Sequence, residues 1–193
     1  MKVCIDAGHG FGNRTSGVYD TGAVHGFLDE ADITLQWALT GKWILGQHGI
    51  DVFLTRDDDN DVTPVWLRND IAEEAGCTRL ISIHCNASSN EYANGTETYA
   101  RFSPGIENQS FAWASLVQTM AIKVLGTKDR GVKNETQSQH SSLAVLDFKT
   151  GPSCLLELGF ISNPMDRALL TRRAYRINFW AEVAQRLSLL KNA

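Results

Sequence analysis

Val3-Cys4-Ile5-Asp6-Ala7-Gly8-His9-Gly10 is a short, mostly apolar run that ends in a histidine flanked by glycines. Such a run is typical of a buried strand, and the glycines permit a sharp turn as the chain leaves a sheet. Leu80–Asn86 repeats the arrangement around His84, and Cys154–Phe160 delivers Glu157 in the same way. Because open α/β sheets gather their chemistry at the carboxyl ends of strands, we expect these side chains to meet.

Strand-like and helix-like segments alternate along the chain, which predicts an α/β fold. A twisted, mostly parallel central sheet of about six strands flanked by helices is expected. The strand after His84 follows a loop too short for a crossover helix, so it is predicted to pair antiparallel and make the sheet mixed. The expected strands are 2–7, 51–55, 79–84, 96–101 and 153–158, the expected helices are 29–47, 64–75, 108–125 and 164–190, 8–27 is expected as a loop, and 129–147 as a loop with short helix or strand pieces.

Bulk properties narrow the functional classes. The 193 residues indicate a single domain, 1–193, and we expect a monomer. A net charge of −4 argues against nucleic-acid binding, which favours a basic surface. No apolar stretch is long enough to insert into a membrane. Met1-Lys2 runs directly into a strand, so we expect no secretory signal and synthesis in the cytoplasm, with the four cysteines reduced.

Two imidazoles and a carboxylate at one sheet edge would suit a Zn²⁺ ion that keeps one position open for water. His9 and His84 are the predicted imidazole ligands. Helix phase selects the acid: Glu30 lies about 20° around the helix axis from Trp37 on the apolar stripe, whereas Asp29 lies about 80° away. Glu30 therefore points inward as the third ligand, and Asp29 is better interpreted as a helix cap. The candidates weighed between the two histidines are Asp20, His25, Asp29, Glu30 and Asp32.

Two further acids lie in apolar strands, where carboxylates are rare without a partner or a task. Glu157 is predicted to be the catalytic general base, with a structural ion pair as the alternative. Asp6 either bonds to a ligand histidine or braces the following loop. The other histidines, His25, His48 and His140, are expected to lie outside the site, and Cys85 is expected to be a reduced thiol rather than a ligand or nucleophile.

Seven segments together resemble the zinc-dependent N-acetylmuramoyl-L-alanine amidases of the amidase-3 type, nearly from end to end. Ala7, Phe11 and Thr34 depart from the usual pattern of that family, and none of them is a predicted ligand. The resembling segments are Ile5–Gly10, Asp20–Ala23, Glu30–Leu35, Val52–Arg56 with Arg68, Ser82–Ala87, Arg130–Lys133 and Glu157–Asn163.

The resemblance implies that His9, Glu30 and His84 bind Zn²⁺ and that Glu157 is catalytic. It also implies peptidoglycan as the substrate, cut at the amide between N-acetylmuramic acid and the L-alanine of the stem peptide. A zinc peptidase that cuts within the stem, or a wall-binding domain with a dead site, are the alternatives. A phage endolysin made inside its host is the expected setting, with a bacterial cell-wall amidase domain as the other; either would act on the cell wall.

Overall fold

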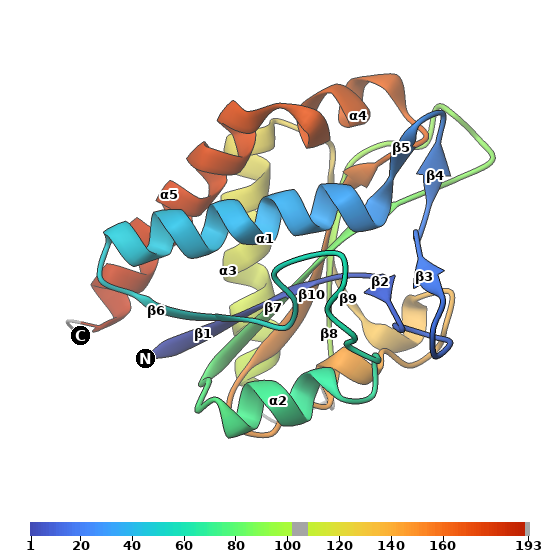
Figure 1. The fold of residues 1–193 in the computed structure, drawn as a ribbon. Coiled ribbons are helices and arrows are strands. Elements are labelled where there is room, and N and C mark those ends of the chain that lie inside the picture. Colours follow the sequence, from blue (N-terminus) through green and yellow to red (C-terminus); the bar gives the residue numbers. More distant parts are fainter. Residues whose placement is uncertain (102–107, 192–193) are drawn as a thin grey trace.

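A six-stranded mixed sheet lies at the centre of the molecule (Figure 1). The computed structural model describes residues 1–101 and 108–191. The strands are β1 Lys2–Ala7, β6 Asp51–Leu54, β7 Arg79–Asn86, β8 Thr96–Ala100, β9 Asp129–Asn134 and β10 Ser153–Phe160. They are arranged in the order β6-β1-β7-β10-β8-β9. All neighbours pair parallel except β8 and β10, which are antiparallel. The predicted α/β class and mixed, mostly parallel sheet are therefore confirmed.

Successive side chains of a strand point to opposite faces of the sheet, so each face presents apolar side chains that must be buried. Different helices cover the two faces. Helices α1 Glu30–Gln47, α3 Gln109–Leu125 and α5 Arg173–Lys191 pack on the face that forms the larger core. Helix α2 Arg68–Glu74 and the 3₁₀ turn η2 Ala144–Leu146 cover a smaller cluster on the opposite face (Figure 1). Toward the carboxyl ends of the strands, that second face carries polar side chains instead, and the candidate site lies there.

Two predicted helices differ from the observed ones. The helix expected over 64–75 spans Arg68–Glu74, because 64–67 forms a turn in which the Leu67 amide donates to the Pro64 carbonyl. The helix expected over 164–190 is two helices, α4 Pro164–Thr171 and α5, separated at Arg172, whose ψ of 122° is extended. The indole N–H of Trp37 donates to the Leu170 carbonyl, which satisfies one of the acceptors that the end of α4 leaves unpaired.

Other boundaries agree with the capping signals in the sequence. The Asp29 carboxylate accepts from the Asp32 amide at 2.8 Å, so Asp29 caps α1 as predicted. Asn108 caps the start of α3, and Gly126 ends it in the left-handed conformation. The segment expected as a loop over 8–27 contains two short ladders, β2 Gly10–Phe11 with β3 Tyr19–Asp20 and β4 Val24–His25 with β5 Leu28–Asp29. Within the described ranges, none of the helices has both the length and the apolar composition needed to cross a bilayer.

Asp6 forms a buried ion pair with Arg68, at 2.7 Å between the carboxylate and Nη1. The hydroxyls of Thr55 and Ser82 donate to the same carboxylate at 2.6 and 2.5 Å. Arg68 also donates to the carbonyl of His9 at 2.6 Å. Two roles were considered for Asp6. Its contacts in the described residues agree with a brace for the following loop, and the predicted hydrogen bond to a ligand histidine is not among them. Burial raises the pKa of Asp6, but Arg68 and the two hydroxyls outweigh it and lower that pKa to about 2.

Replacing Asp6 by asparagine is expected to lower the free energy of unfolding at pH 7 by about 3–5 kcal/mol, because the substitution leaves the Arg68 charge buried and unpaired. Since the folded-state pKa lies below the unfolded value, the stabilisation from Asp6 is present above pH ~4 and is lost as the pH falls toward about 2. Urea unfolding of the wild type and Asp6→Asn at several pH values measures this. Asp70→Asn, at an exposed position on α2, is the matched control. Equal stability of the two variants would contradict the network's role.

Candidate metal centre

His9 lies just beyond the end of β1 in a strained backbone conformation, with a φ of +64° that non-glycine residues rarely adopt. Two buried arginines fix this turn through its carbonyl groups. Arg68 donates to the His9 carbonyl at 2.6 Å, and Arg56 donates to the Gly8 carbonyl at 3.0 Å. Such a strained conformation persists only where the surrounding structure stabilises it, so these hydrogen bonds fix the position of His9 and the direction of its imidazole.

Gly8 allows the two imidazoles to approach each other. A Cβ atom at this position would lie 2.4 Å from the His84 ring, closer than any side chain tolerates. The absence of that atom lets His84, which projects from β7, pack beside the turn that holds His9. The two rings lie 5.0 Å apart between centroids in an edge-to-face arrangement.

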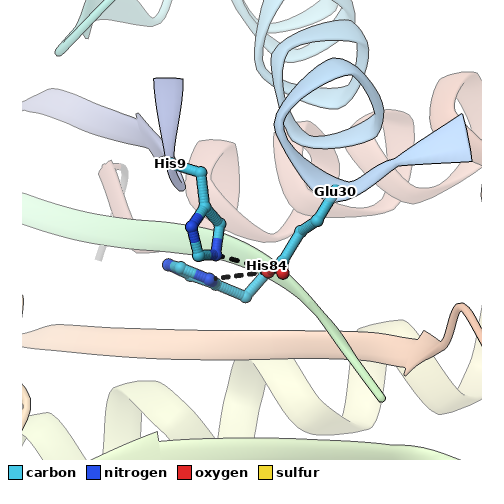
Figure 2. Close-up of side chains that lie close together, drawn as sticks. All are labelled: His9, Glu30 and His84. Carbon is cyan, nitrogen blue, oxygen red and sulfur yellow. Dashed lines mark hydrogen bonds and ion pairs between the residues drawn. The ribbon is translucent and has the colours of Figure 1, made fainter. Parts of the chain in front are cut away.

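The carboxylate of Glu30, the first residue of α1, contacts the rings of both histidines (Figure 2). Its Oε2 is 3.0 Å from His9 Nε2, and its Oε1 is 2.9 Å from His84 Nδ1. The backbone amides of Ala23 and Cys85 also donate to this carboxylate, each at 2.9 Å. Burial raises the pKa of Glu30, but the bonds from His84 and His9 outweigh it and hold that pKa far below its ordinary value, so the group is ionised.

The three side chains have the donor set and spacing of a metal site. One nitrogen from each imidazole and one carboxylate oxygen all lie within 4.8 Å of one another. Two histidines and a glutamate are a known ligand set for a catalytic zinc ion, which bonds to such atoms at about 2.0–2.2 Å. The sequence selected these three residues, and the structure brings them together from the turn after β1, from α1 and from β7; their role as ligands stays a prediction.

Asp20 contacts the far side of His9 instead of joining the three residues. Its Oδ2 lies 3.1 Å from His9 Nδ1 and also accepts from Asn13 at 2.6 Å. Arg14 pairs with the same oxygen at 3.1 Å. Burial lowers the pKa of His9, but bonds and charge from Glu30 and Asp20 outweigh it and raise that pKa. A carboxylate on the second nitrogen of a ligand histidine fixes the ring's tautomer and orientation.

Replacing Asp20 by asparagine is expected to weaken metal binding by about 10–100-fold, the usual effect of losing a group that orients a ligand histidine. Competition with a chromophoric zinc chelator measures the affinity. Asp32→Asn removes an exposed acid from the nearby first turn of α1 and serves as the control. An Asp20→Asn affinity equal to that of the control would show that Asp20 does not support His9.

Glu157 lies on β10 directly opposite His84 of β7. Paired positions on adjacent strands face the same way, so its carboxyl group lies beside the His9–Glu30–His84 cluster. Within the described residues, its Oε2 is buried without a hydrogen-bond partner, and the charges that act on it are the negative ones of Glu30 and Glu97, which disfavours the structural ion pair considered for it. Burial, and then the negative charges of Glu30 and Glu97, raise the pKa of Glu157 well above the ordinary value. An acid with this environment suits proton transfer.

The remaining candidates lie elsewhere. His25 and His140 are exposed, and His48 caps the end of α1. Cys85 is buried, and burial raises the pKa of its thiol, which disfavours the reactive thiolate. Three acidic residues form a second cluster, in which one carboxylate oxygen of each lies within 4.8 Å of the others: Asp57, Asp58 and Asp61. It belongs to a surface loop in which the carboxylates of Asp58 and Asp61 accept from backbone amides of the loop itself, and the Asp57 carboxylate pairs with Lys42.

Known proteins match this chain over nearly its whole length. The family model described as N-acetylmuramoyl-L-alanine amidase, of the amidase-3 type, matches residues 3–188. An uncharacterised protein of Bacillus subtilis, YqiI, is 36% identical over 90% of this chain and 77% of its own length. The N-acetylmuramoyl-L-alanine amidase LytC of the same organism is 30% identical over 90% of this chain, which covers only 32% of LytC.

A solved structure shows the same fold. The catalytic domain of CwlV, an N-acetylmuramoyl-L-alanine amidase from Bacillus (Paenibacillus) polymyxa var. colistinus, superposes with a TM-score of 0.81 at 30% identity. The match covers 99% of this chain and 98% of that domain. With the family match over residues 3–188, this places the chain as an amidase-3 type catalytic domain. The chain belongs to the amidase-3 family of N-acetylmuramoyl-L-alanine amidases.

Proposed function

We propose that this chain is a zinc-dependent peptidoglycan amidase that hydrolyses the bond between N-acetylmuramic acid and the L-alanine of the stem peptide. The observation that supports this most strongly is the arrangement of His9, Glu30 and His84 around one point, with Glu157 beside them. The substrate is the one named for the family and for LytC.

The donor set suits zinc better than magnesium or calcium. Two imidazole nitrogens and one carboxylate are typical of zinc, whereas the other two ions prefer oxygen ligands alone. When bound, zinc supplies a Lewis acid that polarises the amide carbonyl and increases the acidity of water. His9 and His84 would bind the ion through Nε2 and Nδ1, the atoms that now face Glu30.

Glu157 performs the proton transfers in this proposal. As a base, its carboxylate takes a proton from the attacking water; as an acid, it returns that proton to the nitrogen of the departing alanine. The negative charge of Glu30 contributes to the raised pKa of Glu157. A cation held by Glu30 would offset this charge and move the pKa of Glu157 back toward the range where one group both accepts and donates a proton near neutral pH.

Mass spectrometry of digested peptidoglycan tests the proposal. The expected products are stem peptides with a new L-alanine amino terminus and glycan chains that keep intact muramic acid. New termini within the stem would instead identify a peptidase. The absence of any cleavage by zinc-loaded protein would favour the wall-binding domain, although His9, Glu30, His84 and Glu157 are all present.

The biological setting stays a prediction. We propose that the domain acts on the cell wall as a phage endolysin after synthesis in the host cytoplasm, with a bacterial cell-wall amidase as the alternative. The relatives reported above are bacterial proteins. Lysis of host cells on induced expression together with a membrane-permeabilising partner would support the endolysin role, and retention of viable, unlysed cells under the same conditions would contradict it.

A further inference from the structure

A row of charged side chains extends from the candidate metal centre across three neighbouring strands. His84 on β7 pairs with Glu157 on β10, and Glu157 pairs with Glu97 on β8. Residues directly opposite each other share one face of the sheet, with Cβ atoms about 4.5–5.5 Å apart. The next strand, β9, contributes Arg130 and Lys133, both of which contact Glu97. The row therefore ends in two cations.

Glu97 holds these two cations in place. Its Oε2 is 2.6 Å from Arg130 Nε and 2.5 Å from Lys133 Nζ. Its Oε1 accepts from Asn86 at 2.8 Å and from the Tyr99 hydroxyl at 2.9 Å. The Glu97 side chain is only 3% exposed. Burial raises its pKa, but the bonds from Lys133, Arg130 and Tyr99 outweigh it and lower that pKa, so Glu97 is a fixed anion.

One carboxylate does not neutralise two cations, so the end of the row carries a positive charge. The side chains of Arg130 and Lys133 remain 29% and 25% exposed. A guanidinium has five N–H donors and an ammonium has three. Among the described residues, their contacts to Glu97 and to the Asn94 carbonyl leave donors on both groups. Arg130 also lies over the Phe160 ring, 5.0 Å from its centroid, which fixes the guanidinium.

We propose that Arg130 and Lys133 form a subsite that binds a carboxylate of the leaving stem peptide, and this inference rests on the proposed amidase function. Strand β9 is two strands from β10, or about 10 Å at a spacing of about 4.8 Å. Extended peptide spans about 3.3–3.6 Å per residue. Because the two long side chains reach back toward Glu157, the bound carboxylate belongs to a residue about one or two positions beyond the L-alanine.

The charge distribution assigns this subsite to the peptide and not to the sugar. Once the lactyl group of N-acetylmuramic acid is joined in an amide, the glycan near the scissile bond carries no ionised group. The stem peptide does carry carboxylates, so a positive end of the row attracts the peptide half of the substrate. The peptide then runs from β10 toward β9, and the sugar lies on the side of β1 and the loop that follows it.

Binding of two matched product peptides to the zinc-loaded protein tests the inference without relying on turnover. One peptide begins with L-alanine and has a free α-carboxylate on its second residue, and the other has a carboxamide at that place. Wild-type protein should bind the carboxylate peptide at least about tenfold more tightly in an NMR titration, since a hydrogen bond to a charged group contributes enough for that ratio. Lys133→Met should reduce the ratio to about two or less, and Lys133→Arg should restore most of it.

Lys128→Met is the matched control, because it removes an exposed lysine from the segment that leads into β9. It should keep the wild-type ratio. A wild-type ratio near one, or equal ratios for Lys133→Met and Lys128→Met, would overturn the subsite and leave the amidase proposal standing. Preference for the carboxylate peptide together with cleavage at another bond of the wall would retain the subsite and overturn the amidase proposal.

Discussion

Replacing Glu157 by glutamine is expected to lower kcat on peptidoglycan by about 10²–10⁴-fold, the usual contribution of a positioned acid–base group. The side-chain amide of glutamine has nearly the same shape as the carboxyl group of Glu157. It can neither take a proton from water nor return one to the leaving nitrogen. Glu157 lies beside the three clustered side chains without being one of them, so zinc should remain bound.

Two measurements on the same preparation separate this role from a structural one. Release of new amino termini from purified walls gives the rate, and metal analysis of the dialysed protein gives the zinc content. Asp70→Asn removes an exposed carboxylate of α2 and is the matched control, with turnover expected at the wild-type rate. Turnover by Glu157→Gln within a few-fold of the wild type would refute the acid–base role.

Replacing Glu30 by glutamine is expected to remove most of the bound metal and, with it, the activity. Glu30 is the only one of the three predicted ligands that brings a negative charge to the site, and it bonds to both histidines. The loss of affinity should exceed the roughly 10–100-fold typical of an outer residue such as Asp20. In chelator competition at equal protein concentration, zinc affinity should be highest for the wild type, lower for Asp20→Asn and lowest for Glu30→Gln.

Thermal unfolding with and without added zinc provides an independent readout for this variant. Wild-type protein should gain stability as zinc is added, because a ligand that binds only the folded state stabilises it. Glu30→Gln should gain much less over the same concentrations. A zinc-dependent gain equal to that of the wild type would show that Glu30 does not hold the ion.

Local sequence patterns were sufficient to predict the three residues of the candidate centre. His9 and His84 each follow a short apolar strand, and strand ends meet at one edge of a parallel sheet. Glu30 was distinguished from Asp29 by helix phase, and Asp29 does cap α1. These signals are local periodicities, which depend little on the rest of the chain.

Features that depend on distant contacts could not be predicted in this way. The break at Arg172 is accompanied by a bond from Trp37, 133 residues away from Leu170 in the sequence. The role of Asp20 depends on the two-residue ladder of β2 and β3, which has no periodic pattern to detect. Glu97 had no such signal: β8 is buried throughout in the structure, but its sequence carries Thr96 and Thr98 and is not apolar, so the argument used for Glu157 would not have selected it.

Anomalous diffraction from crystals of the zinc-loaded protein, recorded at the zinc absorption edge, would locate the metal ion. We expect one strong peak about 2.0–2.2 Å from His9 Nε2, His84 Nδ1 and an oxygen of Glu30. A peak at another place, or none beside these three side chains in protein that cleaves walls, would contradict this expectation.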